Sequence, residues 1–382
     1  MRTIHLFPLS LLVAAAAFSC SKKEENEGDR TPPEPTIDDD AGATPQATDD
    51  AGGDVGPPPG TEDPTGNPIL LGPPREVRSF NAGGEAQFVD GPQWSAARNA
   101  MWVSLPLARN LEGGRGILTT FKEDGTNYTE LRAGDNLTTG VIGNSIDKDG
   151  NLISAELKSI TRTTPDGTVT TIADAYSPIN PQNPAEVPVK FDTPNDLVAL
   201  DDGTIFVTDP GYAVTPRPDK GHLIRISAPE ATTGRVNVTA AQTYDTNPSP
   251  NGIALSKDQK TLYVGFTQPP FGTLPYVRKY TINADRSLTD VGKFIELPVD
   301  SQPDGLALDE SDNLFVALKT GIAVFKATGE PYGGAGAKLP QTPIAGEVTG
   351  VTFIGQARKS LLVTTTNGKA LELKVKVAGL AQ

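Results

Sequence analysis

The chain has 382 residues, enough for two ordinary domains or for one large β architecture. Its 47 acidic and 33 basic residues give a formal charge of −14, which argues against a protein that binds nucleic-acid phosphates. One cysteine excludes an intramolecular disulfide, and two histidines make a multi-histidine zinc site or a histidine-based catalytic relay improbable.

The first twenty residues predict export and a lipid anchor. Arg2 precedes an apolar run over residues 4–17 that is too short to span a bilayer as a stable helix. The run leads into Ala-Phe-Ser-Cys at residues 17–20, which resembles the bacterial lipobox. We therefore expect residues 1–19 to be a lipoprotein signal peptide and Cys20 to be lipidated, so that a lipid alone holds the exported chain on a bacterial membrane, at its periplasmic or cell-surface face. The alternative is an ordinary signal peptide with an incidental cysteine.

The next segment has the composition of a linker. Residues 21–66 are rich in Pro, Gly, Asp, Glu and Thr and contain 13 acidic but only 3 basic residues. With almost no large apolar side chain, such a segment cannot bury enough surface to offset the entropy lost on ordering. We expect residues 20–74 to form a disordered acidic linker that acts as a solvated spacer.

A sixfold repeat organises the rest of the chain. Beyond residue 75, short β-rich runs recur without helical periodicity, and most of them follow a polar turn. These runs are Met101-Trp102-Val103, Leu152-Ile153, Ile205-Phe206-Val207, Leu262-Tyr263-Val264, Leu314-Phe315-Val316 and Leu361-Leu362-Val363. Another short strand precedes each turn, and these strands open at residues 90, 143, 195, 251, 304 and 350, about fifty residues apart.

This period predicts an all-β, six-bladed β-propeller over residues 75–382, with one four-stranded sheet per repeat. We expect a C-terminal strand near residues 371–377 to pair with an N-terminal strand near residues 75–80 and close the ring. A pair of β-sandwiches with evenly spaced hairpins is the alternative, but it leaves the sixfold recurrence unexplained.

Four polar residues at the starts of the repeats are candidate metal ligands. In a propeller the innermost strand of each blade lines the central channel, so equivalent positions converge on one axis. This rule brings together Asp90, Asn195, Asn251 and Asp304. Two carboxylates and two amide oxygens suit Ca²⁺ best, with Mg²⁺ or Mn²⁺ as further candidates; Zn²⁺ is disfavoured, since His222 is the only histidine left after export. Each residue taken singly could instead be an ordinary turn former.

Several motifs resemble those of the regucalcin (senescence marker protein) and gluconolactonase family. They are Asp90-Gly91-Pro92-Gln93-Trp94, Pro194-Asn195-Asp196, Phe206-Val207-Thr208-Asp209-Pro210, Pro250-Asn251-Gly252-Ile253-Ala254 and Pro303-Asp304-Gly305-Leu306. The resemblance spans residues 75–375 and implies a six-bladed propeller that holds a divalent metal and hydrolyses lactones. By this likeness Asp90, Asn251 and Asp304 are metal ligands and Asp304 is also the general base. Asn195 is then a ligand or a substrate contact.

The chain departs from the family pattern at three places. Asp90 stands where the family usually has a glutamate, one methylene longer. In the second repeat Ile142 occupies the ligand register, and Asn144 lies two positions further on the same strand face, where it could contact substrate. Glu156 matches an acidic position of the bacterial lactonases and is a further candidate substrate contact, although Leu157 replaces the histidine that usually follows.

Tyr212 follows a strand that ends at the channel mouth, so we expect it at the substrate rim, with simple loop packing as the alternative. The function that these residues predict is metal-dependent opening of sugar lactones, in which the metal polarises the carbonyl and a carboxylate assists water attack. The alternatives are a calcium-dependent phosphotriesterase or esterase of the same fold and a non-catalytic ligand-binding propeller. We expect a monomer whose partner is a small lactone or ester.

Overall fold

A computed structural model of the chain describes residues 73–82, 85–106, 117–133, 140–177, 187–212, 214, 216–268, 273–332 and 341–380. The predicted signal peptide, Cys20 and the predicted linker as far as residue 72 lie outside the described residues. The described part belongs wholly to the unit Pro57–Gln382. Its secondary structure is all β, and it contains no helix that is long and apolar enough to cross a membrane.

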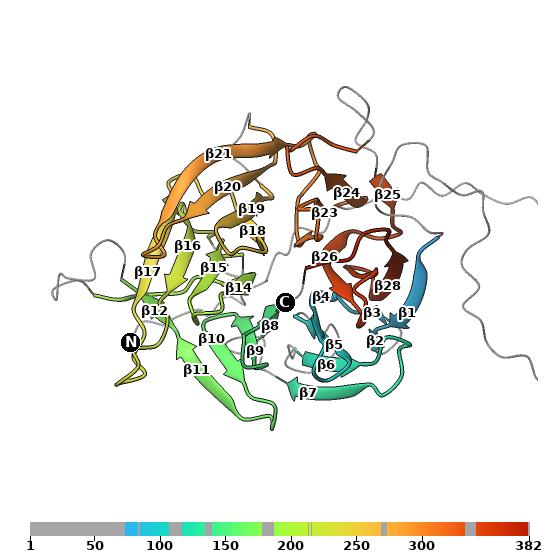
Figure 1. Cartoon of the computed structure of the whole chain (residues 1–382), viewed down its shortest axis with the longest axis horizontal. Helices are drawn as coiled ribbons and strands as arrows, with labels where there is room; N and C mark the ends of the chain where they lie inside the picture. Colours follow the sequence, from blue (N-terminus) through green and yellow to red (C-terminus); the bar gives the residue numbers. More distant parts are fainter. Residues whose placement is uncertain are drawn as a thin grey trace, which may run out of the picture. The chain divides into compact units, whose positions relative to one another are not determined.

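Six four-stranded antiparallel sheets are arranged around a common axis, so the predicted six-bladed propeller is confirmed (Figure 1). Blade one contains β4 (Asp90–Ser95), β5 (Ala100–Leu105), β6 (Ile117–Phe121) and β7 (Thr129–Ala133). Blade two contains β8 (Val141–Ile146), β9 (Leu152–Glu156), β10 (Ile160–Thr163) and β11 (Val169–Ala173). Blade three contains β14 (Leu197–Ala199), β15 (Ile205–Asp209), β16 (Gly221–Ile226) and β17 (Val238–Tyr244).

Blade four contains β18 (Pro250–Leu255), β19 (Thr261–Phe266), β20 (Tyr276–Ile282) and β21 (Leu288–Glu296). Blade five contains β22 (Leu306–Leu308), β23 (Leu314–Leu318), β24 (Gly321–Phe325) and β25 (Gln341–Pro343). Blade six contains β26 (Val348–Ile354), β27 (Ser360–Thr365) and β28 (Lys369–Lys374) together with β1 (Arg75–Ser79). Two small hairpins, β2 (Asn81–Ala82) with β3 (Glu85–Ala86) and β12 (Ala175–Tyr176) with β13 (Val189–Lys190), were not predicted from the sequence.

The six apolar runs are the second strands of the six blades. All five residues of β23 are buried, because each blade packs between two neighbours and its middle strands are covered on both faces. The core therefore consists of clusters between adjacent blades, such as the one in which Phe315 of blade five meets Phe353 of blade six with ring centroids 5.0 Å apart.

The polar turns between the first and second strands are held by aspartates. Asp147 accepts hydrogen bonds from the backbone N–H groups of Asp149 (3.0 Å) and Asn151 (2.9 Å), and Asp309 accepts them from Ser311 and Asn313 in blade five. These side chains satisfy amides that the hairpin leaves unpaired, which explains why the turns recur with Asp, Asn and Gly.

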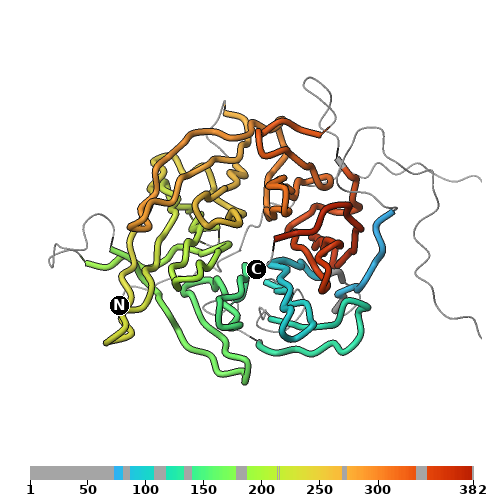
Figure 2. The backbone as a smooth tube through the Cα atoms, in the orientation of Figure 1, coloured from blue at the N-terminus to red at the C-terminus, as the bar shows by residue number. Residues whose placement is uncertain are grey.

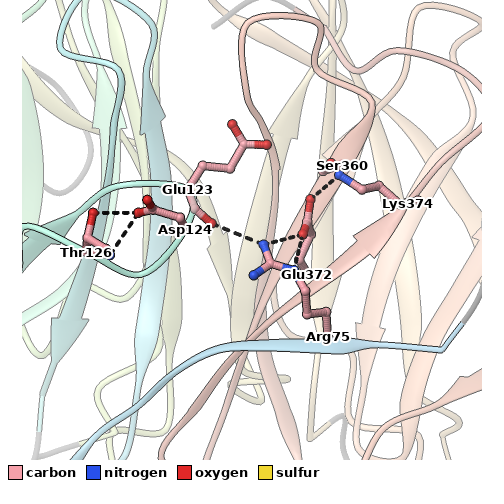
Figure 3. Close-up of polar contacts among 7 residues, drawn as sticks. All are labelled: Arg75, Glu123, Asp124, Thr126, Ser360, Glu372 and Lys374. Carbon is pink, nitrogen blue, oxygen red and sulfur yellow. Dashed lines mark hydrogen bonds and ion pairs between the residues drawn. The ribbon is translucent and has the colours of Figure 1, made fainter. Parts of the chain in front are cut away.

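The ring closes as the sequence predicts, because β1 pairs antiparallel with β28 and becomes the outer strand of blade six (Figures 1 and 2). Glu372 of β28 is 3% exposed and accepts two hydrogen bonds from Arg75, at 2.8 Å from Nε and 2.5 Å from Nη2 (Figure 3). Burial alone would raise the pKa of Glu372, but hydrogen bonds from Lys374, Ser360 and Arg75 hold it below its ordinary value. The pairing of β1 with β28, called the seam below, is thus stabilised by a charged hydrogen-bonded contact as well as by its backbone hydrogen bonds.

Removing the arginine of this seam should weaken the closure. Arg75→Met leaves Glu372 with one charged partner fewer, and we expect the free energy of unfolding to fall by about 1–3 kcal/mol in urea titrations. The control is Lys293→Met, which breaks an exposed pair with Glu296 and should cost less than about 0.5 kcal/mol. Equal effects of the two substitutions would contradict a special role for the seam.

Candidate functional site

A cavity of about 50 Å³ lies between the six innermost strands, and every blade contributes to its wall. Asp90, Asn195 and Asp304, three of the four predicted metal ligands, line it. Asn251 joins them through a side-chain hydrogen bond to Asp304. Three predicted ligands therefore share one cavity and the fourth is tied to it. The cavity has room for a cation and one or two waters, so a sugar lactone would have to bind at its mouth.

Glycines allow the innermost strands to approach so closely. The residue that follows the ligand register is glycine in five blades, namely Gly91, Gly143, Gly252, Gly305 and Gly350. A Cβ atom on Gly252 would lie 1.9 Å from the carbonyl oxygen of Asp304, and one on Gly143 would lie 2.4 Å from that of Asn195. Any side chain at these positions would push a ligand-bearing strand away from the axis.

The third blade breaks this pattern with Asp196, a carboxylate that was not predicted from the sequence to belong to the site. Asp196 lines the cavity, and its two oxygens accept the backbone N–H groups of Leu197 at 2.9 Å and of Ile253 in blade four at 3.2 Å. The Asp196 side chain therefore lies between the innermost strands of blades three and four, whereas glycine lets the backbones of the other blades approach directly. Comparison of the six repeats at this register could have revealed it, because it is the only charged residue there.

The three carboxyl groups are electrostatically strained when no cation neutralises them. Burial, reinforced by the charge of Asp196, raises the pKa of Asp90 to about 7 against a hydrogen bond from Gly91. Burial also raises the pKa of Asp196 to about 7, although two backbone hydrogen bonds oppose the shift. Burial and then the charges of Asp90 and Asp196 raise the pKa of Asp304 well above its ordinary value. Such a cluster favours protons or a cation.

Asn251 offers an oxygen to such a cation. Its Nδ2 donates to Thr267 Oγ1 at 2.9 Å, whereas its Oδ1 is buried and has no hydrogen-bond partner among the described residues. An orphaned buried acceptor beside a carboxylate cluster fits a hard, oxygen-binding metal ion. The described residues contain no group of three or more His, Cys, Asp and Glu that could hold a metal ion. The ligand roles themselves remain predictions.

Two of the predicted substrate contacts are engaged within the protein. Asn144 is buried; its Nδ2 donates to Gly91 O and to Ser104 Oγ, both at 2.8 Å, and its Oδ1 accepts from Ser154. It lines the cavity but its main contacts join blades one and two. Glu156 is 1% exposed and forms an ion pair with Arg132 at 2.5 Å, away from the cavity lining. Their proposed contacts with substrate stay predictions.

Tyr212 does not line the cavity but lies near enough for its hydroxyl to feel the charge of Asp304, and its place at a substrate rim stays a prediction. It is 37% exposed, the guanidinium of Arg217 stacks 5.2 Å from its ring centroid, and its hydroxyl is hydrogen-bonded to Thr267 and Ser249. Desolvation of the hydroxyl and the charge of Asp304 raise its pKa to about 12. Tyr212 is therefore a neutral phenol near the predicted base, and its hydroxyl is engaged within the protein.

The fold and this cavity define a six-bladed propeller with a carboxylate-lined central channel. The chain belongs to the SMP-30/gluconolactonase/LRE-like family, whose model matches residues 88–367 and confirms the resemblance. A gluconolactonase of Zymomonas mobilis subsp. mobilis is 25% identical over 272 residues, covering 65% of this chain and 69% of that protein. Membership of this family supports a lactonase-type function.

Solved structures agree with this assignment. The gluconolactonase of Xanthomonas campestris matches with a TM-score of 0.60 and 25% identity, covering 81% of this chain and 96% of that chain. A calcium-binding protein, regucalcin, of Agrobacterium tumefaciens matches with a TM-score of 0.58 and 18% identity, covering 80% and 95% respectively. At that identity the second likeness concerns the fold alone.

The raised pKa values make a prediction about cation binding. Because Asp90 has a pKa of about 7 and must lose its proton to bind a cation, Ca²⁺ affinity should increase as the pH rises from 5.5 to 8, with release of protons. Isothermal titration calorimetry in two buffers of different ionisation enthalpy measures both quantities. Asp90→Asn should reduce affinity and the number of protons released, while Asp196 and Asp304 keep part of the pH dependence. An affinity that is the same at both pH values would argue against Asp90 as a ligand.

Proposed function

We propose that this protein is a metal-dependent lactonase that opens sugar lactones at the channel mouth. The observation that carries the proposal is the convergence of Asp90, Asn195 and Asp304 on one cavity, with the unpartnered oxygen of Asn251 beside them. Family membership supports the lactonase-type reaction, and the gluconolactonase relatives support sugar lactones as substrates. We propose Ca²⁺ as the cation, held by Asp90, Asn195, Asn251 and Asp304.

The reaction needs few protein groups. A divalent cation bound to these residues would polarise the lactone carbonyl and favour the ionised form of the carboxylates. Asp304 accepts a proton from a water whose oxygen attacks the carbonyl carbon. The ring C–O bond then breaks, and the proton passes to the departing alkoxide oxygen, which yields the open hydroxy acid. Tyr212 contacts the substrate at the rim, and no serine or cysteine nucleophile is required.

Substitution of Asp304 tests this mechanism. Asp304→Asn and Asp304→Ala should each lower kcat for gluconolactone by at least about 100-fold, because both remove the general base. Far-UV circular dichroism checks the fold, and Asp149→Asn, at a turn carboxylate that is exposed, is the matched control. Activity that survives both substitutions would dispose of the mechanism.

The same assay distinguishes substrate classes. Gluconolactone, homoserine lactones and aryl esters are compared with added CaCl₂ and after treatment with a chelator, which should abolish turnover. Preference for aryl esters would favour the esterase alternative, and no turnover of any of them would favour a binding protein.

We further propose that the chain is exported and anchored through a lipid on Cys20, on the support of the sequence at residues 17–20. Expressed in a bacterium with lipoprotein processing, the wild type should incorporate labelled palmitate and sediment with membranes. Cys20→Ala should lose the label and enter the soluble fraction. A labelled or membrane-bound Cys20→Ala protein would refute the anchor, and cleavage without lipid would favour an ordinary signal peptide.

A further inference from the structure

One hydroxyl group connects three parts of the candidate site. Thr267 follows β19 directly and is half-buried. Its Oγ1 donates to the carbonyl oxygen of Pro303, the residue before the predicted base, at 2.6 Å. The same oxygen accepts a hydrogen bond from Asn251 Nδ2 at 2.9 Å and is hydrogen-bonded to Tyr212. The backbone of Thr267 is fixed as well, because its N–H donates to Ser249 O at 3.1 Å.

The direction of these bonds, with the hydrogen bond that Asn251 gives to the Asp304 carboxylate, determines how the Asn251 amide is oriented. A threonine hydroxyl has one proton, and that of Thr267 is committed to the Pro303 carbonyl. Toward Asn251 the oxygen can therefore only accept, so the amide must present its NH₂ group. If the amide were rotated by 180°, two acceptor oxygens would face each other. The remaining amide oxygen, Oδ1, is the one left without a partner among the described residues.

We propose that Thr267 is a positioning residue that fixes the Asn251 amide with its oxygen available to the cation. This inference rests on the proposed function, because it concerns the same cation site. The committed proton of Thr267, together with the hydrogen bond that the Asn251 NH₂ group gives to Asp304, leaves Oδ1 as the amide atom that can accept a cation. Groups that orient metal ligands in this way affect metal affinity strongly.

Neighbouring hydroxyls do not share this role. Thr208 donates to the backbone oxygen of Asn251 at 2.7 Å, and Thr349 donates to the carbonyl oxygen of Val89 at 2.5 Å. Both fasten one blade to the next near a predicted ligand. Among the described residues they contact backbone groups and, for Thr349, the Thr364 hydroxyl at 2.9 Å, but not the side chain of a predicted ligand. The geometry therefore singles out Thr267.

The experiment measures Ca²⁺ affinity by isothermal titration calorimetry on the full chain. Thr267→Val, which replaces the hydroxyl by a methyl group, should weaken Ca²⁺ binding about 10- to 100-fold. Thr267→Ser keeps the hydroxyl and should stay within about threefold of the wild type. The matched control is Thr120→Val in β6, the third strand of blade one. It removes a half-buried hydroxyl that donates to Met101 O of β5, and it should leave the affinity unchanged.

The outcomes separate this inference from the proposed function. A wild type that binds no Ca²⁺ overturns both, whereas a wild type that binds Ca²⁺ as tightly as Thr267→Val overturns the inference alone. Thr267→Ala replaces Thr267→Val if the latter fails to fold.

A double-mutant cycle tests the orientation argument itself. Asn251→Asp has two acceptor oxygens and no preferred orientation, so adding Thr267→Val to it should change Ca²⁺ affinity by less than about threefold. If Thr267→Val weakens Ca²⁺ binding as much in the Asn251→Asp variant as in the wild type, Thr267 does not act by orienting the Asn251 amide.

Discussion

The close approach of the six innermost strands is the constraint on which the rest of the structure depends. Carbonyl oxygens and α-carbons of neighbouring blades lie where a Cβ would have to be, as at Gly252 against Asp304. This contraction places residues from distant repeats around a cavity of about 50 Å³. Wider spacing of the strands would leave the same oxygens too far apart to surround one ion. The repeated glycine is thus as necessary to the cavity as the predicted ligands that precede it.

The close approach of the strands also buries carboxylates, and this lowers the stability of the metal-free folded state near neutral pH. Asp90 and Asp196 have pKa values near 7, so in the folded state they keep protons that the unfolded chain releases above a pH of about 4. Stability contributed by these groups is therefore present below that pH and is lost as the pH rises toward 7. Buried charges that weaken the metal-free fold are typical of a site shaped for a ligand.

Much of the architecture could be predicted from the sequence, because a fifty-residue repeat leaves a plain pattern. The six apolar runs became the second strands, and the pairing of β1 with β28 followed from the need to close the ring. Side-chain partners were harder to foresee. Glu156 is engaged by Arg132 of another blade, and Thr267 reaches Asn251 and Pro303 across a blade boundary. Such contacts depend on the geometry between repeats, which periodicity within one repeat does not encode.

The seam between the two ends of the propeller has a consequence for how the protein is made. Arg75 and Glu372 are separated by 297 positions, so the first strand to be synthesised must wait for the last before it can pair. Until then the sixth blade lacks its outer strand and exposes an edge. Folding can therefore finish only after the whole polypeptide has been delivered, and a prematurely terminated chain is left as an open, aggregation-prone arc.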